Sequence, residues 1–145
     1  MRLTDETASR VSLTLESKLE SVETVEQTTL DFAQRAGFDE DTASNLAMVV
    51  REAAVNAVIH GNKYDHNKHV TATFDLSTEA LVITVADQGG GLDPDKLPDP
   101  LAAENLLRTN GRGVFLMRAF MDEVHFRKLT PGTEITMIKR RSLPA

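Results

Sequence analysis

The sequence contains no cysteine and no tryptophan, and it contains a single tyrosine. The absence of cysteine excludes a disulfide framework, a thiolate nucleophile and a cysteine-based zinc site. The core of such a chain is aliphatic, with six phenylalanines as its main aromatic residues. Because 145 residues can bury one core without covalent or metal cross-links, we expect a single domain over residues 1–145.

An excess of basic residues is also missing, since 16 Lys and Arg stand against 22 Asp and Glu and the formal net charge is −6. Domains that bind nucleic acid present clustered Lys and Arg to phosphates, so we expect no direct nucleic-acid partner. No apolar run is long enough for a signal peptide or a membrane span. These absences predict a soluble, cytoplasmic protein with no membrane partner.

The hydrophobic pattern predicts both strands and helices. Apolar and polar residues alternate, as in half-buried strands, over residues 11–16, 70–76, 81–85, 124–127 and 134–140. Apolar residues recur at helical spacing over residues 18–36, 39–60 and 114–122. Turns at 77–79 and at Pro131-Gly132 connect neighbouring strands. We therefore expect an α+β fold, with a mixed, mostly antiparallel sheet and helices packed on one face.

The helix predicted over residues 39–60 carries Glu52, Asn56 and His60 at intervals of four. Positions four apart on an α-helix differ by about 40° around the axis, so these side chains can face one pocket. Asn costs about half a kcal/mol relative to Ala inside a helix, which indicates a purpose for Asn56. The alternative is that Glu52 and Asn56 face solvent. For His60 we favour a packing role near the helix end.

A second polar segment, Asp87-Gln-Gly89-Gly-Gly91, follows directly after a predicted strand. Glycine allows the backbone to approach a ligand closely, and an Asp at a strand end can accept a hydrogen bond from an exocyclic amine. A purine is the obvious donor of such a bond. The alternative is a flexible turn in which Asp87 is simply the first residue.

A third segment, Gly111-Arg112-Gly113, precedes the helix predicted over residues 114–122. Free backbone N–H groups and the positive end of the helix dipole suit a phosphate there, and Arg108 adds charge nearby. An ordinary helix cap with solvated arginines is the alternative. Three prolines between the second and third segments predict a long irregular loop, which we interpret as a functional lid.

Taken in order, the three segments resemble the GHKL ATPase superfamily, whose Bergerat ATP-binding fold is a two-layer α/β sandwich. More narrowly, the chain resembles the bacterial anti-sigma factor serine/threonine kinases of the RsbW and SpoIIAB type. Residues 52–61 match the N box of this family, 87–91 its first glycine box and 111–117 its second. Gly132-Thr133 matches its final G-T element. The combination is far more specific than any one segment.

The resemblance implies a role for each matching residue. Asn56 would hold a Mg²⁺ ion that bridges the phosphates of ATP, and Glu52 would be the general base for an attacking serine hydroxyl. Asp87 would bind the adenine amino group, with Thr133 close by. Further nucleotide contacts are implied for Gly89 and Gly91 in the first glycine box, and for Arg108, Gly111, Arg112 and Gly113 in a lid over the triphosphate.

The resemblance also implies a function. The chain would be an ATP-dependent serine/threonine protein kinase and anti-sigma factor that acts by partner switching, as a homodimer. It would hold a sigma factor and phosphorylate a STAS-domain anti-anti-sigma protein. One alternative is an ATP-binding module that sequesters a partner without phosphoryl transfer. Another is a histidine kinase catalytic domain, which the GRGVFLM form of the second glycine box disfavours. A metal site at His66-x-x-His69 is not expected, because no carboxylate or Cys stands at useful spacing.

Overall fold

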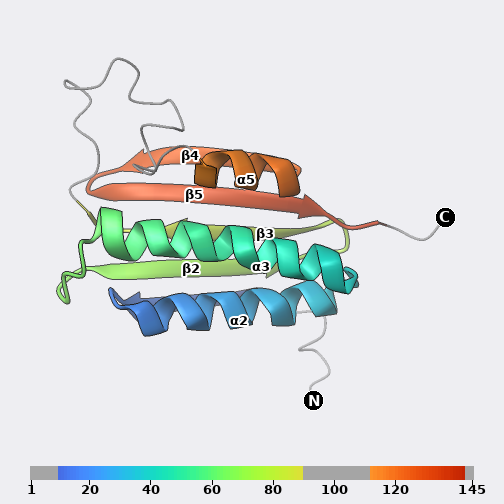
Figure 1. Cartoon of the computed structure of the whole chain (residues 1–145), viewed down its shortest axis with the longest axis horizontal. Helices are drawn as coiled ribbons and strands as arrows, with labels where there is room; N and C mark the ends of the chain where they lie inside the picture. The colour runs from blue at the N-terminus through green and yellow to red at the C-terminus, as the bar shows by residue number, and fades with distance from the viewer. Residues whose placement is uncertain (1–9, 90–111, 143–145) are drawn as a thin grey trace.

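The computed structural model describes residues 10–89 and 112–142, with backbone alone at 112 and 113. A five-stranded sheet forms one layer, and helices cover one of its faces (Figure 1). In chain order the elements are β1 (Arg10–Glu16), α2 (Leu19–Arg35), α3 (Glu40–Val55), the π-helix η1 (Asn56–Gly61), β2 (His69–Leu76), β3 (Ala80–Ala86), α5 (Arg112–Phe120), β4 (Glu123–Leu129) and β5 (Gly132–Arg140). The predicted α+β fold with helices on one face is confirmed.

The strand order across the sheet is β1-β2-β3-β5-β4. All four pairings between neighbouring strands are antiparallel, so the described strands include none of the parallel pairs that a mixed sheet would contain. The predicted hairpin is present, and the side chain of Ser77 closes it by accepting a hydrogen bond from Ala80 N at 3.1 Å.

The core lies between the sheet and the helices. Alternate residues of β2 and β3 face the helices and are buried: Val70, Ala72 and Phe74 on β2, and Leu81, Ile83 and Val85 on β3. Phe74 stacks on Phe32 of α2, with ring centroids 5.4 Å apart. Burying a side chain of this size completely stabilises the folded chain by roughly 1.5–3 kcal/mol, so the contact between Phe74 and Phe32 holds α2 against the sheet.

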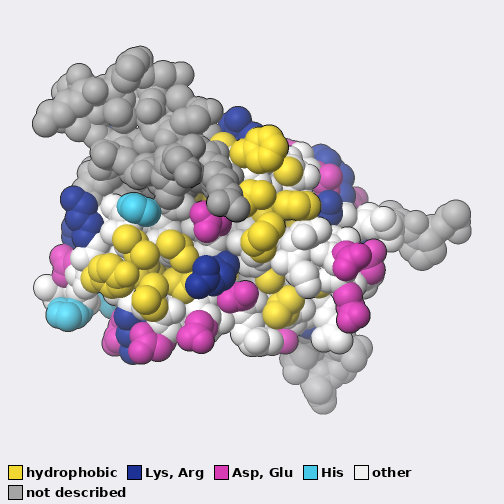
Figure 2. Space-filling model, viewed as in Figure 1, with side chains coloured by type: hydrophobic (Ala, Val, Ile, Leu, Met, Phe, Trp, Pro, Cys, Tyr) yellow, Lys and Arg dark blue, Asp and Glu magenta, His cyan; other side chains and the backbone are white. Residues whose placement is uncertain are grey.

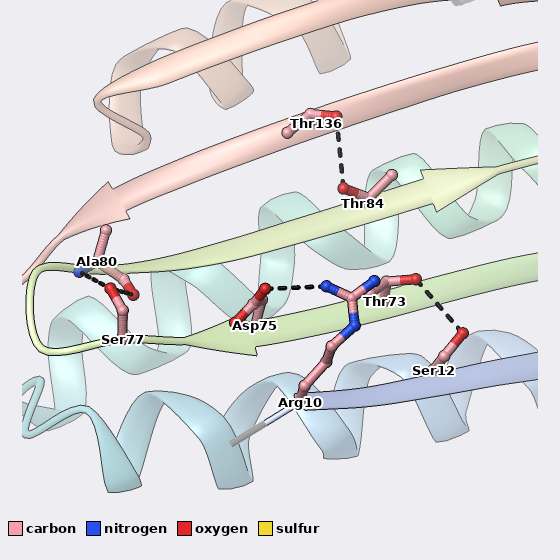
Figure 3. Close-up of polar contacts among 8 residues, drawn as sticks. All are labelled: Arg10, Ser12, Thr73, Asp75, Ser77, Ala80, Thr84 and Thr136. Atoms are coloured by element: carbon pink, nitrogen blue, oxygen red, sulfur yellow. Dashed lines mark hydrogen bonds and ion pairs between the residues drawn. The ribbon is translucent and has the colours of Figure 1, made fainter. Parts of the chain in front are cut away.

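None of the described helices covers the opposite face of the sheet, where Figure 3 shows polar side chains in contact across the strands. Ser12, Thr73, Thr84, Thr136 and His125 lie in register across all five strands. The hydroxyls of Ser12 and Thr73 are 3.5 Å apart, and those of Thr84 and Thr136 are 3.4 Å apart. Period-two alternation therefore separates a hydrophobic side of the sheet from a hydroxyl-lined side.

The two long helices begin and end where the sequence predicted, with one exception. Gly37, at φ 86°, follows α2, and Asp39 Oδ1 accepts a hydrogen bond from Thr42 N at 2.7 Å to cap α3. The exception is the end of α3, which continues as the π-helix η1. Asn62 N donates to Ala57 O, five residues back, at 2.8 Å.

The π-helix changes the row expected from α-helical spacing. Glu52 and Asn56 keep the spacing of α3, but His60 lies beyond the point where the π-turn begins. His60 is exposed, so the packing role predicted for it is wrong. A wider turn rotates the following residues away from the register that a continuous α-helix would give them.

Candidate functional site

Three segments meet around Asp87: the end of η1, the end of β3 and the start of β5. In Figure 1, β3 ends and β5 begins at the left-hand end of the sheet. Asp87 exchanges hydrogen bonds with β5, because Asp87 N donates to Thr133 O at 3.0 Å and Thr133 N donates to Asp87 Oδ1 at 3.2 Å. Gly89 N also donates to Oδ1, at 3.0 Å. Thr133, predicted to be close to Asp87, is therefore in direct contact with it.

Asp87 is only 9% exposed. Burial raises the pKa of its carboxyl group, while the N–H groups of Gly89 and Thr133 and the charge of Lys68 act in the opposite direction. Both backbone donors bind Oδ1, and no described residue donates a hydrogen bond to Oδ2. Among the described residues one oxygen is thus fixed by two N–H groups, and the other keeps its capacity to accept hydrogen bonds.

Three glycines make this meeting of segments possible. A Cβ on Gly61 would lie 2.5 Å from Asp87 Cγ, and one on Gly89 would overlap Gly61 O. A Cβ on Gly132, which has φ 116°, would overlap Asp87 O. Sequence reasoning did not find the contacts of Gly61 and Gly132 with Asp87. A glycine at the end of a helix and another at the start of a strand are the only signals, and both also occur in ordinary caps and turns.

Asn56, the first residue of η1, is 5% exposed. Its Nδ2 donates to Glu52 O at 2.9 Å, while its Oδ1 is buried and has no hydrogen-bond partner among the described residues. A buried acceptor that receives no hydrogen bond lowers the stability of the folded chain by about 1–3 kcal/mol, and one that receives a hydrogen bond does not. An amide oxygen is among the ligands that hard divalent cations prefer, so this atom fits a magnesium ion.

Glu52 lies on α3, one turn before Asn56, and is partly exposed. Four residues of α-helix advance about 6 Å along the axis, so its carboxylate and the carboxamide of Asn56 are neighbours on one helical face. A partly exposed carboxylate beside a cation ligand can accept a proton from a polar group bound there.

The second glycine segment is described only in part. Gly91, Arg108 and Gly111, together with nearly all of the predicted lid, lie outside the described residues. α5 (Arg112–Phe120) begins two residues earlier than the helix predicted over residues 114–122, so Arg112 lies inside the helix and not before it. Gly113 is the second residue of that helix.

Residues 10–89 and 112–142 contain neither a cluster of metal-ligating side chains nor a helix that could span a membrane. No group of three or more His, Cys, Asp or Glu side chains that could hold a metal ion occurs there. None of the helices in these ranges has both the length and the hydropathy to cross a membrane.

Comparisons with known proteins show which family the chain resembles. A family model described as a histidine kinase-like ATPase domain matches residues 15–139. The chain is 35% identical over 130 residues to a serine-protein kinase RsbW of Bacillus licheniformis, which covers 85% of this chain and 80% of that protein. It is 30% identical over 138 residues to RsbW of Bacillus subtilis, covering 91% and 86%. An anti-sigma F factor of Anoxybacillus flavithermus is 31% identical over 102 residues, covering 68% and 70%.

A solved structure has the same fold. It is a crystal structure of the RsbU and RsbW domains of a Mycobacterium tuberculosis protein, with a TM-score of 0.68 and 19% sequence identity. The match covers 94% of this chain and 33% of that longer one.

Proposed function

The chain belongs to the histidine kinase-like ATPase family, within the GHKL superfamily and of the RsbW type, and from this membership we propose that it is an ATP-dependent serine/threonine protein kinase and anti-sigma factor. The observation that carries the proposal is that, among the described residues, the buried Asp87 carboxylate receives hydrogen bonds on Oδ1 alone and the buried Oδ1 of Asn56 receives none. The carboxylate of Asp87 suits an amine donor, and the Oδ1 atom of Asn56 suits a cation.

Asp87 recognises the adenine base in this proposal. Its Oδ2 accepts a hydrogen bond from the exocyclic amine, while Oδ1 stays bonded to the N–H groups of Gly89 and Thr133. Recognition by a buried carboxylate is selective, because a base without that amine leaves the carboxylate unpaired. Gly89 and Gly91 allow the backbone to approach the base closely.

The phosphates extend from the adenine towards Asn56. A Mg²⁺ ion held by Asn56 would neutralise part of the phosphate charge. The carboxamide of Asn56 offers Oδ1 as the ligand, and its Nδ2 stays bonded to Glu52 O. Arg112 and Gly113 at the start of α5 would add positive charge and backbone N–H groups to the phosphate site. The family resemblance adds Arg108 and Gly111, which lie outside the described residues.

Glu52 is the general base of the proposed reaction. Its carboxylate accepts the proton of a serine hydroxyl as the serine oxygen forms a bond to the γ-phosphorus. The bond between that phosphorus and the bridging oxygen of ADP breaks, and ADP leaves with the electron pair. A loose transition state needs mainly positioning and charge, so one base one helical turn from the cation ligand is sufficient.

The proposed protein partners are a sigma factor and a STAS-domain anti-anti-sigma protein, with the kinase acting as a cytoplasmic homodimer. Relatives named as serine-protein kinases and as an anti-sigma F factor support the protein-kinase and sigma-factor roles, while the homodimer is what the family resemblance implies. Each helix of the covering layer exposes a large hydrophobic side chain: Leu19 is 51% exposed, Met48 39% and Phe115 71%. Figure 2 shows hydrophobic side chains gathered on this helical face, as expected for a surface that binds other proteins.

The test is a transfer assay with the purified chain, γ-labelled ATP, Mg²⁺ and STAS-domain proteins from the same genome. We expect labelled phosphate on a serine or threonine of one STAS protein, and capture of a sigma factor by the same chain. ATP binding and sigma capture without any labelling would instead identify a sequestering module. Label on a histidine would indicate a histidine kinase activity.

A further inference from the structure

Asn62, directly after η1, has its whole side chain engaged inside the protein. It is 1% exposed. Its Nδ2 donates to Ser17 Oγ at 2.8 Å and to His69 O at 3.0 Å, and its Oδ1 accepts from Gln88 N at 2.8 Å. Three separate segments therefore attach to one carboxamide: the end of β1, the start of β2 and the loop after β3.

The contact with Gln88 is next to the candidate adenine site. Gln88 is the residue after Asp87. Besides the bond that its backbone N–H donates to Asn62, its side-chain Oε1 accepts a hydrogen bond from His69 N at 2.6 Å. The Asp87 side of this peptide is fixed by Thr133 on β5. The loop is thus held from β5 on one side and from Asn62 on the other.

Asn62 is also fixed to the helix that carries the candidate cation ligand. Its backbone N–H donates to Ala57 O at 2.8 Å and so continues the π-type pairing of η1, whose first residue is Asn56. Its side chain then reaches the loop of Asp87 through Gln88 N. One residue therefore joins the two ends of the proposed nucleotide site.

We propose that Asn62 is a positioning residue for adenine recognition: by holding the peptide of Gln88 it sets the direction of the Asp87 carboxylate relative to the helix of Asn56. The inference depends on the proposed function, in which Asp87 binds the exocyclic amine. A residue with a purely structural role would support the fold without affecting which base is bound. Asn62 is expected to affect the choice of base.

The experiment compares ATP with purine riboside triphosphate, which lacks the exocyclic amine, by calorimetry with Mg²⁺. A hydrogen bond to a charged group gives the wild-type chain a preference for ATP of about tenfold or more. Asn62→Ala is expected to reduce this preference to less than about threefold, with little change in affinity for purine riboside triphosphate, because only the contact with the amine is misdirected.

Two variants separate positioning from stability. Ser17→Ala removes one hydrogen bond of Asn62 but leaves the bond to Gln88 N, so it should lower the melting temperature and keep the preference. Asn62→Asp keeps an acceptor for Gln88 N and loses both donated bonds, so it should also keep the preference despite lower stability. If Asn62→Ala folds poorly, Asn62→Leu, which has a similar branched shape but no acceptor for Gln88 N, should reduce the preference in a folded chain.

Three results would overturn the inference. The first is an unchanged preference in both Asn62→Ala and Asn62→Leu. The second is an equal loss of affinity for both nucleotides in Asn62→Ala, which would indicate a general structural role. The third is a wild-type chain that binds neither nucleotide, which would reject the proposed function as well. In the first two cases wild-type ATP binding remains, so the proposed function survives.

Discussion

Asn56 donates its Nδ2 hydrogen to the backbone oxygen of Glu52 at 2.9 Å, and this bond fixes the direction of the opposite end of the carboxamide. The Oδ1 atom is consequently held in a buried position without a partner among the described residues. A ligand atom that is fixed before the cation arrives needs little reorganisation when it binds. The helix backbone itself orients the proposed magnesium ligand.

Asn56→Ala should therefore separate nucleotide binding from its magnesium dependence. We expect the gain in ATP affinity caused by Mg²⁺ to fall about tenfold or more, because a ligand to the cation is lost. Affinity for ADP in EDTA should change little. The free energy of unfolding without nucleotide should not fall, since Ala removes an unpaired buried oxygen and is the better helix former by about half a kcal/mol.

Calorimetry with Mg²⁺ and with EDTA, together with urea unfolding, measures these effects. Asn45→Ala is the matched control, because Asn45 is a half-buried Asn of the same helix. An equal loss of affinity with and without Mg²⁺ would contradict the role of Asn56 as a cation ligand.

Glu52→Gln should abolish transfer while leaving the site intact. Gln has the same shape but cannot accept the serine proton, and removal of a general base costs about 10²–10⁴-fold in rate. ADP affinity should be unchanged, because the carboxylate makes no contact with the base in the proposed arrangement. Single-turnover labelling measures the rate, with Glu23→Gln on the exposed side of α2 as control. Equal labelling by Glu52→Gln and wild type would reject Glu52 as the base.

Gly132→Ala and Gly37→Ala test the close packing around Asp87. Both glycines have positive φ, so both substitutions introduce backbone strain of about 1–2 kcal/mol. A Cβ on Gly37 meets nothing within 4 Å, whereas a Cβ on Gly132 overlaps Asp87 O. We expect Gly37→Ala to lower stability alone, and Gly132→Ala to lower stability further and to weaken ADP binding at least tenfold, as for a lost hydrogen bond to a charged group. If Gly132→Ala and Gly37→Ala bound ADP equally tightly, Asp87 would tolerate the shift that a Cβ at position 132 imposes on its backbone.

The raised pKa of Asp87 predicts a pH dependence of stability in the absence of nucleotide. Burial makes the folded chain hold the proton of Asp87 to higher pH than the unfolded chain does. The folded state therefore binds more protons between the ordinary pKa of 3.8 and the raised pKa, and stability falls as pH rises through that window. Above the raised pKa the penalty of the buried charge is fully present.

Asp87→Asn removes this titration. We expect the difference in unfolding free energy between wild type and Asp87→Asn to shift in favour of the variant as pH rises from about 4 towards 7. Urea unfolding at a series of pH values measures it. Saturating ADP should lower the pKa of Asp87 in the wild type, because an amine donor favours the ionised form. It should therefore also reduce the change in the unfolding free energy of the wild type with pH. A pH-independent difference would contradict this prediction.

The regular elements could be predicted because each leaves a periodic signal. The alternation in residues 70–76 and 81–85 corresponds to β2 and β3, and the acids after Gly37 correspond to the cap at Asp39. Asp87 and Thr133 were expected near one another from family resemblance, and their reciprocal hydrogen bonds confirm the proximity. Their roles in binding nucleotide remain predictions.

Other features leave no such signal. A π-turn uses the same residue types as an α-helix, so the exposure of His60 could not be predicted from spacing. The contact between Gly132 and Asp87 joins residues 45 positions apart, and a single glycine does not indicate its distant neighbour. The hydrogen bonds of Asn62 likewise join segments far apart in the sequence, and the residue resembles any polar residue of a loop.

In the π-helix, the number of residues constrains the geometry of the site as strongly as the identity of the side chains does. A π-turn contains one residue more than an α-turn, so deleting a single residue between Asn56 and Gly61 would restore α-helical pairing and rotate the residues after the deletion by about 100°. Gly61 would then turn away from Asp87, and Asn62 would turn away from Gln88. A homologue one residue shorter in this segment could be aligned with every site residue matched and still position its adenine loop differently.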